Sequence, residues 1–190
     1  ALAERFARLD VAADEVEGGD AAAVQDDLAG RGAAEAELLL LDAPGEARQR
    51  AVVDDRDAFA NRERFPTATE VVVEDVPAWL TAATLPASSY VVVVTRGHRH
   101  DLDAMRAVVG RDLRYVGLIG SRAKVARVYE ALVEEGVAPV RFANIHAPIG
   151  LDLGAVTPQE IAVSILAELI AVRRGRTADP AVASASLKWT

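Results

Sequence analysis

The sequence predicts an α/β protein: a doubly wound, mostly parallel sheet with helices on both faces. Short apolar runs without alternation recur along the chain, and such runs are typical of strands buried on both faces. Helical patterns follow several of them, and this order favours parallel strands joined by right-handed crossovers. Aromatic residues make up only 5% of the 190 residues, which suits this architecture better than a sandwich of short antiparallel strands.

Five apolar runs have the length of strands. They are Leu38–Leu41, Ala51–Val53, Val71–Val73, Tyr90–Val94 and Tyr115–Ile119. Helices are predicted at Asp101–Val109, Arg122–Glu135 and Pro158–Arg173.

The last helix has the clearest start signal. Thr157 can cap it, Pro158 takes its first position and Glu160 completes a capping box. An apolar stripe then predicts the side that lies on the sheet; its members are Ile161, Ile165, Leu169 and Val172.

The chain is expected to hold one main domain, at residues 37–178. Residues 1–36 are predicted to be a helical lead-in to it, with helices at Ala1–Leu9 and Ala21–Leu28. Residues 179–190 are predicted to be a loose tail, because the end of the chain is small and polar.

Composition excludes several classes of function. The net charge of -8 argues against a nucleic-acid binder, which needs clustered basic residues. The chain has no cysteine, so neither a disulfide framework nor a thiolate metal site is expected. It also lacks an apolar run long enough to span a bilayer and the pattern of a signal peptide. We therefore expect a cytoplasmic protein that binds no membrane.

Acidic side chains follow the second predicted strand. A carboxylate in this position accepts hydrogen bonds from a ribose diol in dinucleotide-binding sheets, which makes Asp54 and Asp55 candidate sugar ligands. A carboxylate after a strand is also a common cap or turn residue, and spacing alone favours that role. Arg56 beside them leaves open a phosphorylated ribose instead.

A glycine-containing turn follows the strand predicted at Tyr115–Ile119. Here Gly120 lets backbone N–H groups approach an anion at a helix N-terminus, and Arg122 adds a bidentate donor. A phosphate or a pterin phosphate fits such a turn. A tight strand-to-helix turn with Ser121 as N-cap explains the same residues equally well.

Thr95, His98 and His100 follow the strand predicted at Tyr90–Val94. Imidazoles beside carboxylates bind metals or act as acid and base near neutral pH. A metal site is not favoured, because alternation points the imidazoles of an extended segment to opposite sides. We expect an active-site loop in which one histidine contacts a ligand; solvent exposure of both is the alternative.

An irregular stretch rich in glycine and proline, Asn144–Gly154, precedes the last helix. It contains His146, Pro148 and Gly150. Such a loop costs conformational entropy and is typically either functional or a packed lid. Its position beside the strand ends favours function.

Five of these segments form a linked set. They are Asp54–Pro66, Thr95–Asp101, Gly117–Lys124, His146–Gly154 and Thr157–Ile165. Together, in order and with sensible spacings, they resemble the Rossmann-type domain of the xanthine dehydrogenase accessory factor (XdhC/CoxI) family. Five linked motifs are far more specific than any single one.

The resemblance implies a Rossmann-like domain that helps mature molybdenum hydroxylases such as xanthine dehydrogenase. It implies binding of molybdenum cofactor (molybdopterin) and help with its sulfuration or its insertion into the apo-enzyme, with a sulfurtransferase as a further partner. An accessory protein is favoured over an enzyme. The residues expected at the cofactor site are Asp54, Asp55, Arg56, Thr95, His98, His100, Gly120, Ser121, Arg122, His146, Pro148 and Gly150.

The chain departs from the family at the start of the domain. The family opens with a strand, a glycine-rich phosphate loop and a full helix, whereas only Asp42–Gln49 separates the first two apolar runs here. A parallel crossover needs roughly a dozen residues or more, so NAD(P) binding is disfavoured.

Two other classes of function stay open. One is a NAD(P)-dependent oxidoreductase, and the other is an interaction scaffold that binds no small molecule. An incomplete first strand–helix–strand unit would leave apolar sheet surface to cover, which favours a homodimer.

Overall fold

The structure is a computed structural model that describes residues 39–40, 50–95 and 97–176. Each predicted strand run contains a strand. The strands are β1 (Leu39–Leu40), β2 (Ala51–Asp54), β3 (Glu70–Val73), β4 (Tyr90–Val93), β5 (Tyr115–Leu118) and β6 (Ile145–His146). The helices are α3 (Val76–Ala82), α4 (His98–Val108), α5 (Arg122–Glu134) and α6 (Pro158–Arg173), with the 3-10 helix η1 at Pro139–Asn144.

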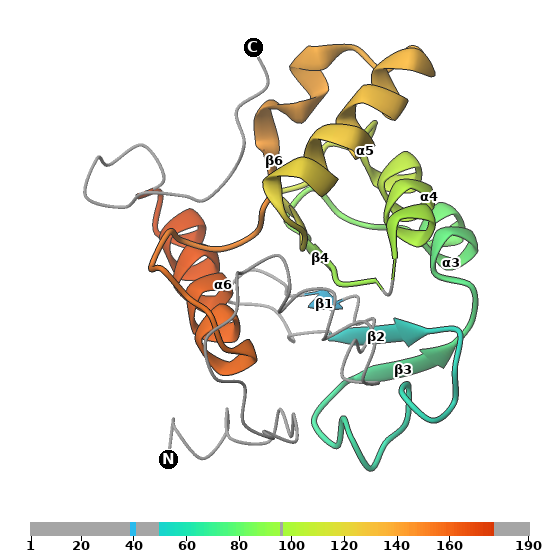
Figure 1. Ribbon diagram of the computed structural model, residues 1–190. Helices are drawn as coiled ribbons and strands as arrows, with labels where there is room; N and C mark the ends of the chain where they lie inside the picture. The colour runs from blue at the N-terminus through green and yellow to red at the C-terminus, as the bar shows by residue number, and fades with distance from the viewer. Residues whose placement is uncertain (1–38, 41–49, 96, 177–190) are drawn as a thin grey trace.

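The strands follow the order of a doubly wound fold. One sheet has the order β1-β4-β5-β6, and a parallel pair, β2 and β3, forms a second sheet. Because β1 also contacts β2, the order of strands across the molecule is 3-2-1-4-5-6. Figure 1 shows β3, β2, β1 and β4 in this order. The β4–β5 and β5–β6 pairs are parallel. The exception is the two-residue strand β1, which pairs with β4 in the antiparallel direction.

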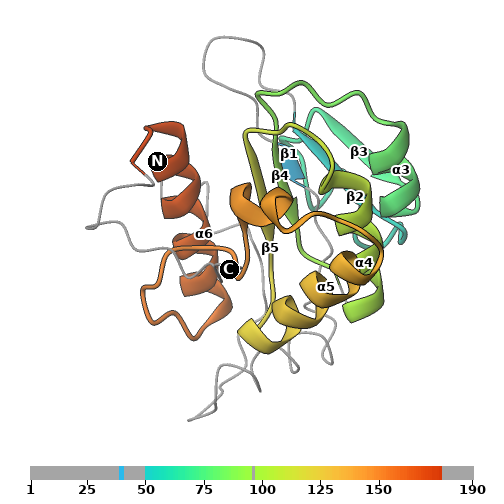
Figure 2. The same ribbon diagram turned by 90° about the horizontal axis from the view of Figure 1, so that it is seen from above.

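Helices cover both faces of the sheet, as predicted. Figure 2 shows α3, α4 and α5 on one side of the sheet and α6 on the other. Alternation along β4 supplies both interfaces: Val91 and Val93 pack with α3, α4 and α5, whereas Tyr90 and Val92 pack toward α6. The structure is therefore a three-layer Rossmann-like domain.

The prediction that every strand is buried on both faces is wrong for β3. Its four residues are half-buried or exposed, and the Val73 side chain is 52% exposed. Among the described strands β3 pairs only with β2, so it lies at an edge of the sheet. Apolar character alone does not distinguish such an edge strand from a central one.

The predicted helix bounds agree with the structure where the sequence carries a clear capping signal. The bounds of α6 agree with the prediction, and both hydrogen bonds of its capping box, between Thr157 and Glu160, are present. Helix α4 begins at His98, three residues before the predicted start at Asp101. The seven-residue helix α3 was not predicted, because it is too short to show a helical period.

Some expectations lie outside the described residues. These are the helices predicted at Ala1–Leu9 and Ala21–Leu28, the connection at Asp42–Gln49 and the tail at residues 179–190.

Close packing between β5 and the segment after β6 depends on a glycine. A Cβ atom at Gly117 would lie 2.7 Å from Ile149 Cγ1 and 2.8 Å from the ring atom Cε1 of Tyr115. Both neighbours are buried, so neither can move aside without disturbing the core between the sheet and α6.

Replacing Gly117 with alanine is expected to lower the free energy of unfolding by about 1–3 kcal/mol, the usual cost of overpacking a core. Urea denaturation followed by circular dichroism measures it. Gly110→Ala is the matched control, because a Cβ there meets nothing within 4 Å. Equal effects of the two substitutions would contradict this account of the packing.

Candidate functional site

Buried carboxylates mark the edge of the sheet at which the parallel strands end. Among the described residues the buried charged side chains are Asp54, Asp101 and Glu168. Asp54 ends β2, Asp101 lies in the first turns of α4 after β4, and Glu168 of α6 reaches the last residue of β6. A buried charge is costly unless it is paired, and each of these carboxylates has a basic partner. The carboxyl ends of the strands are also where ligands bind in open α/β sheets.

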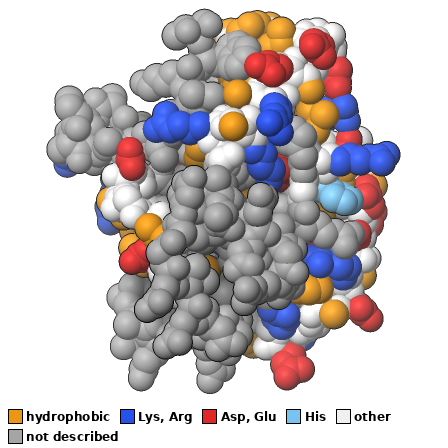
Figure 3. Space-filling model, viewed as in Figure 1, with side chains coloured by type: hydrophobic (Ala, Val, Ile, Leu, Met, Phe, Trp, Pro, Cys, Tyr) orange, Lys and Arg blue, Asp and Glu red, His pale blue; other side chains and the backbone are white. Residues whose placement is uncertain are grey.

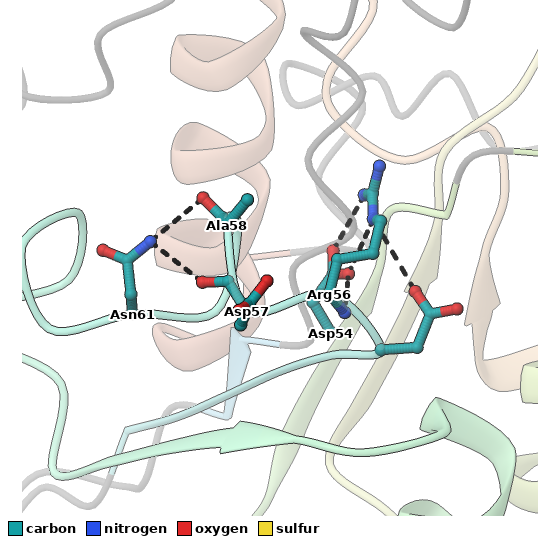
Figure 4. Close-up of polar contacts among 6 residues, drawn as sticks. Asp54, Arg56, Asp57, Ala58 and Asn61 are labelled. Atoms are coloured by element: carbon teal, nitrogen blue, oxygen red, sulfur yellow. Dashed lines mark hydrogen bonds and ion pairs between the residues drawn. The ribbon is translucent and has the colours of Figure 1, made fainter.

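The first pair closes the turn after β2. Arg56 donates through Nε to Asp54 Oδ1 at 2.9 Å and through Nη2 to Oδ2 at 3.0 Å, as Figure 4 shows. The backbone N–H of Arg56 also donates to Oδ1 at 3.0 Å. The hydrogen bond that the Arg56 side chain donates to Asp54 is the largest cause of the raised pKa of Arg56. Asp54 thus has the turn-forming role that spacing alone favoured, and a ribose would have to displace Arg56 to reach it.

Asp55 is the more available of the two adjacent carboxylates. Its side chain is 41% exposed, and its Oδ1 lies 3.6 Å from Arg56 Nε. A ligand at this edge would therefore meet Asp55 before Asp54.

The loop after β2 holds its own shape. The Asn61 amide donates to the carbonyls of Asp57 and Ala58, at 3.2 and 3.0 Å (Figure 4). The guanidinium of Arg56 lies 3.7 Å from the centre of the Phe59 ring, a cation–π contact. Both residues belong to the Asp54–Pro66 segment of the family resemblance: Phe59 contacts Arg56, and Asn61 holds the turn at Asp57 and Ala58.

The second pair joins α4 to α5. Asp101 is fully buried; its Oδ2 lies 2.5 Å from Lys124 Nζ, and its Oδ1 accepts a hydrogen bond from Thr95 Oγ1. A Cβ at Gly120 would lie 3.1 Å from Lys124 Cδ, so the lysine stem crosses close over the turn after β5. Sequence analysis did not assign Asp101 or Lys124 to the site. The sequence signal that could have identified Asp101 and Lys124 is their position: each lies in the first turns of a helix that follows a strand.

Ser121 has the capping role that was one of its two interpretations. Its Oγ accepts a hydrogen bond from the Lys124 backbone N–H at 3.2 Å. Arg122 follows it at the first position of α5, and its side chain is exposed. The structure thus brings Thr95, Gly120, Ser121 and Arg122 together around the Asp101–Lys124 pair.

The two neighbouring histidines were expected in an active-site loop, and their placement in a loop is wrong. His98 and His100 belong to the first turn of α4, whose N-cap is Gly97. This N-cap is a glycine and so offers no side-chain cap, and a Cβ at Gly97 would meet nothing within 4 Å. Helix N-termini favour anions, and Asp101 already places one carboxylate in this first turn.

The third pair lies on the face covered by α6. His146 Nδ1 is 3.1 Å from Glu168 Oε1, and the imidazole stacks on the Tyr115 ring at 4.5 Å between centroids. The Tyr115 hydroxyl and the Gly150 N–H both donate to Glu168 Oε2, at 2.7 and 2.8 Å. Burial first, and then the Glu168 charge, raises the pKa of Tyr115 well above its ordinary value, so this phenol stays a donor. Sequence analysis missed Tyr115 and Glu168, although a glutamate beside the apolar stripe of α6 was a signal.

The loop between β6 and α6 is packed rather than open. Gly150 is buried with a φ of 101°, and a Cβ there would collide with Ser164 Oγ. Pro148 is half-buried. The loop thus carries His146 at its start and is held against α6 by Glu168.

The predicted site residues fall into groups on the two sides of the sheet. Asp101, Lys124 and the turn at Gly120 belong to the side of α4 and α5, whereas His146 and Gly150 pack with α6. The two groups therefore lie on opposite faces of the sheet.

The charged side chains do not gather by sign on the face shown in Figure 3. Lysine and arginine side chains lie scattered there among acidic and apolar ones.

Neither a metal cluster nor a membrane span is found in the part of the chain that the structure describes. No three histidine, aspartate or glutamate side chains there are grouped to hold a metal ion. None of the described helices is long and apolar enough to cross a bilayer.

The three-layer fold and its strand order define a Rossmann-like domain. The family model for the XdhC Rossmann domain matches residues 23–169. The chain belongs to this family.

Three relatives are similar over about two thirds of the chain. It is 36% identical over 124 residues to the uncharacterized protein YqeB of Escherichia coli, with 65% of this chain and 23% of that protein covered. It is 31% identical over 123 residues to a probable xanthine dehydrogenase subunit of Bacillus subtilis, with 65% and 35% covered. A crystal structure of a xanthine dehydrogenase from Bacillus halodurans matches with a TM-score of 0.58 and 29% identity, covering 67% of this chain and 37% of that one. The chain thus spans well under half the length of these relatives.

Lys124→Ala is expected to lower the free energy of unfolding by about 3 kcal/mol, because it removes the Lys124 cation from the buried Asp101 carboxylate. Thermal or urea denaturation measures it. Arg127→Ala on the same helix is the control; its side chain is exposed, so its effect should stay within about 0.5 kcal/mol. A neutral Lys124→Ala would show that the ion pair does not hold α4 against α5.

Proposed function

We propose that this chain is the Rossmann domain of an accessory factor for molybdenum hydroxylases of the xanthine dehydrogenase type. In this proposal it binds molybdenum cofactor as cargo and assists the sulfuration of the cofactor or its insertion into the apo-enzyme. Membership of the XdhC family supports the proposal. So do two relatives that carry xanthine dehydrogenase in their names.

The chemistry of the cargo suits the edge of the sheet. Molybdopterin carries a phosphate and a pterin ring edged with hydrogen-bond donors and acceptors. A phosphate is well held by a helix N-terminus with an arginine beside it. The observation that carries the proposal is that α4 and α5 both begin at this edge, with the uncapped Gly97 turn on one and the exposed Arg122 on the other.

The buried pair between these helices gives the site its rigidity. Lys124 is bound to Asp101 and is only 26% exposed, so it fixes the two helix starts relative to each other. Arg122 is then the side chain that contacts the cargo phosphate. Asp55 supplies an exposed carboxylate that can accept hydrogen bonds from the donor edge of the pterin.

The proposed role requires binding and release, not catalysis by this chain. The partners are a molybdenum hydroxylase apo-enzyme, which receives the cofactor, and a sulfurtransferase, which supplies the sulfur. Because the relatives are much longer than this chain, the sites for both partners need not lie within these residues.

Arg122→Ala is expected to weaken the binding of molybdenum cofactor about tenfold, which corresponds to one lost charge-assisted hydrogen bond. Titration of the purified chain, followed by the absorbance of the cofactor, measures it under anaerobic conditions. Arg127→Ala, one exposed arginine further along α5, should bind as the unmodified chain does.

Other outcomes of the same titration would overturn the proposal. Binding of NAD(H) without binding of molybdenum cofactor would favour an oxidoreductase. A chain whose melting temperature rises with neither ligand would be an interaction scaffold, because a ligand specific for the folded state must raise its apparent stability.

A further inference from the structure

The carboxylate of Glu168 is a buried polar group on the α6 side of the sheet. Its side chain is 1% exposed. It joins three elements that are distant in sequence: Tyr115 on β5, His146 at the end of β6 and Gly150 in the following loop. A buried carboxylate next to a histidine is the arrangement that fixes the orientation and tautomer of an imidazole.

The hydrogen bonds of one carboxylate oxygen determine the role of the other. Oε2 accepts from two groups that can only donate here, the Tyr115 hydroxyl and the Gly150 N–H. Accepting two such bonds favours the ionised carboxylate. Oε1 of that carboxylate is then an acceptor as well. It lies 3.1 Å from His146 Nδ1 without the alignment of a hydrogen bond, and this buried Nδ1 has no other hydrogen-bond partner among the described residues. An acceptor on Oε1 requires the proton of a neutral imidazole to be on Nδ1.

The surroundings of the imidazole leave its other nitrogen for a ligand. Nδ1 is shut off from solvent, yet the side chain as a whole is 19% exposed. The Tyr115 ring covers one face of the imidazole. Among the described residues no hydrogen bond to Nε2 is found, so this lone pair is available at the carboxyl end of β6.

We propose that Glu168 is a positioning residue that holds His146 as the Nδ1–H tautomer, so that Nε2 accepts a hydrogen bond from an N–H or O–H group of a bound ligand. The ligand assignment rests on the proposed function: the donor would come from the pterin edge of the cofactor. The tautomer assignment stands apart from the identity of the ligand.

Nitrogen NMR of the chain labelled with ¹⁵N-histidine tests the tautomer directly. The chain has three histidines, and His146→Asn identifies the signals of His146 by their loss. At about two pH units above the ordinary histidine pKa of about 6.5, the unmodified chain should show a protonated Nδ1 and an unprotonated Nε2 at His146. A protonated Nε2 would overturn the proposal.

The Glu168→Gln substitution is expected to reverse the tautomer of His146. Tyr115 and Gly150 both donate to the Oε2 position, so the amide oxygen must take that position and the NH2 group must face Nδ1. His146 should then switch to the Nε2–H tautomer, a change that a purely structural role does not predict. A folded Glu168→Gln chain that keeps Nδ1–H would overturn the proposal.

Tyr115→Phe is the matched control, because it keeps the ring stacked on His146 and the Gly150 donor. It should leave the tautomer unchanged. If Glu168→Gln does not fold, the measurement on the unmodified chain still decides the tautomer.

A cofactor titration with the same variants separates this inference from the proposed function. Glu168→Gln should weaken binding of molybdenum cofactor about tenfold, because Nε2–H can no longer accept, whereas Tyr115→Phe should bind nearly as the unmodified chain does. Equal binding by all three would overturn the ligand contact. If the unmodified chain binds no cofactor while the tautomer is as expected, the proposed function fails and the positioning role of Glu168 survives.

Discussion

The structure at the carboxyl ends of the strands depends on one constraint, the free-energy cost of burying a charged side chain. A carboxylate placed among buried side chains must be neutralised or hydrogen-bonded by a partner that can reach it. Asp54 and Asp101 meet this constraint with the cations of Arg56 and Lys124. Glu168 meets it with hydrogen bonds from Tyr115 and Gly150 and lies beside His146. These contacts link β2 to its following loop, α4 to α5, and α6 to β6. Replacing a buried ion pair by apolar residues is often neutral or stabilising, so the Asp54–Arg56 and Asp101–Lys124 pairs are by themselves weak evidence of a gain in stability.

The motif residues divide into those that build the edge and those that face a ligand. Internal contacts account for Phe59, Asn61 and Gly117. Ser121 caps helix α5. The side chains of Asp55 and Arg122 are exposed at the same edge. A sequence motif records both kinds of residue without distinguishing them. Burial and hydrogen-bond partners make that distinction, and they move the emphasis from Asp54 to Asp55 and from Ser121 to Arg122.

The fold was largely predictable because its signals are local. Apolar runs located β2, β4 and β5, and the capping box at Thr157 located the start of α6. Features without a local period were missed: the two-residue strand β6 within the loop thought irregular, the short helix α3, and the early start of α4. The buried network of the site was harder still. Tyr115 and Glu168 are 53 residues apart in sequence, and only the packing of α6 on β5 brings them together.

Hydrogen–deuterium exchange with and without molybdenum cofactor tests the central claim most directly, because it reports where a bound ligand protects backbone N–H groups. The account predicts slower exchange in the first turns of α4 and α5, around Gly97 and Ser121, when the cofactor is added. The α6 segment after Glu168 should exchange as before. Protection confined to other regions, or none at saturating cofactor, would contradict the placement of the site at this edge.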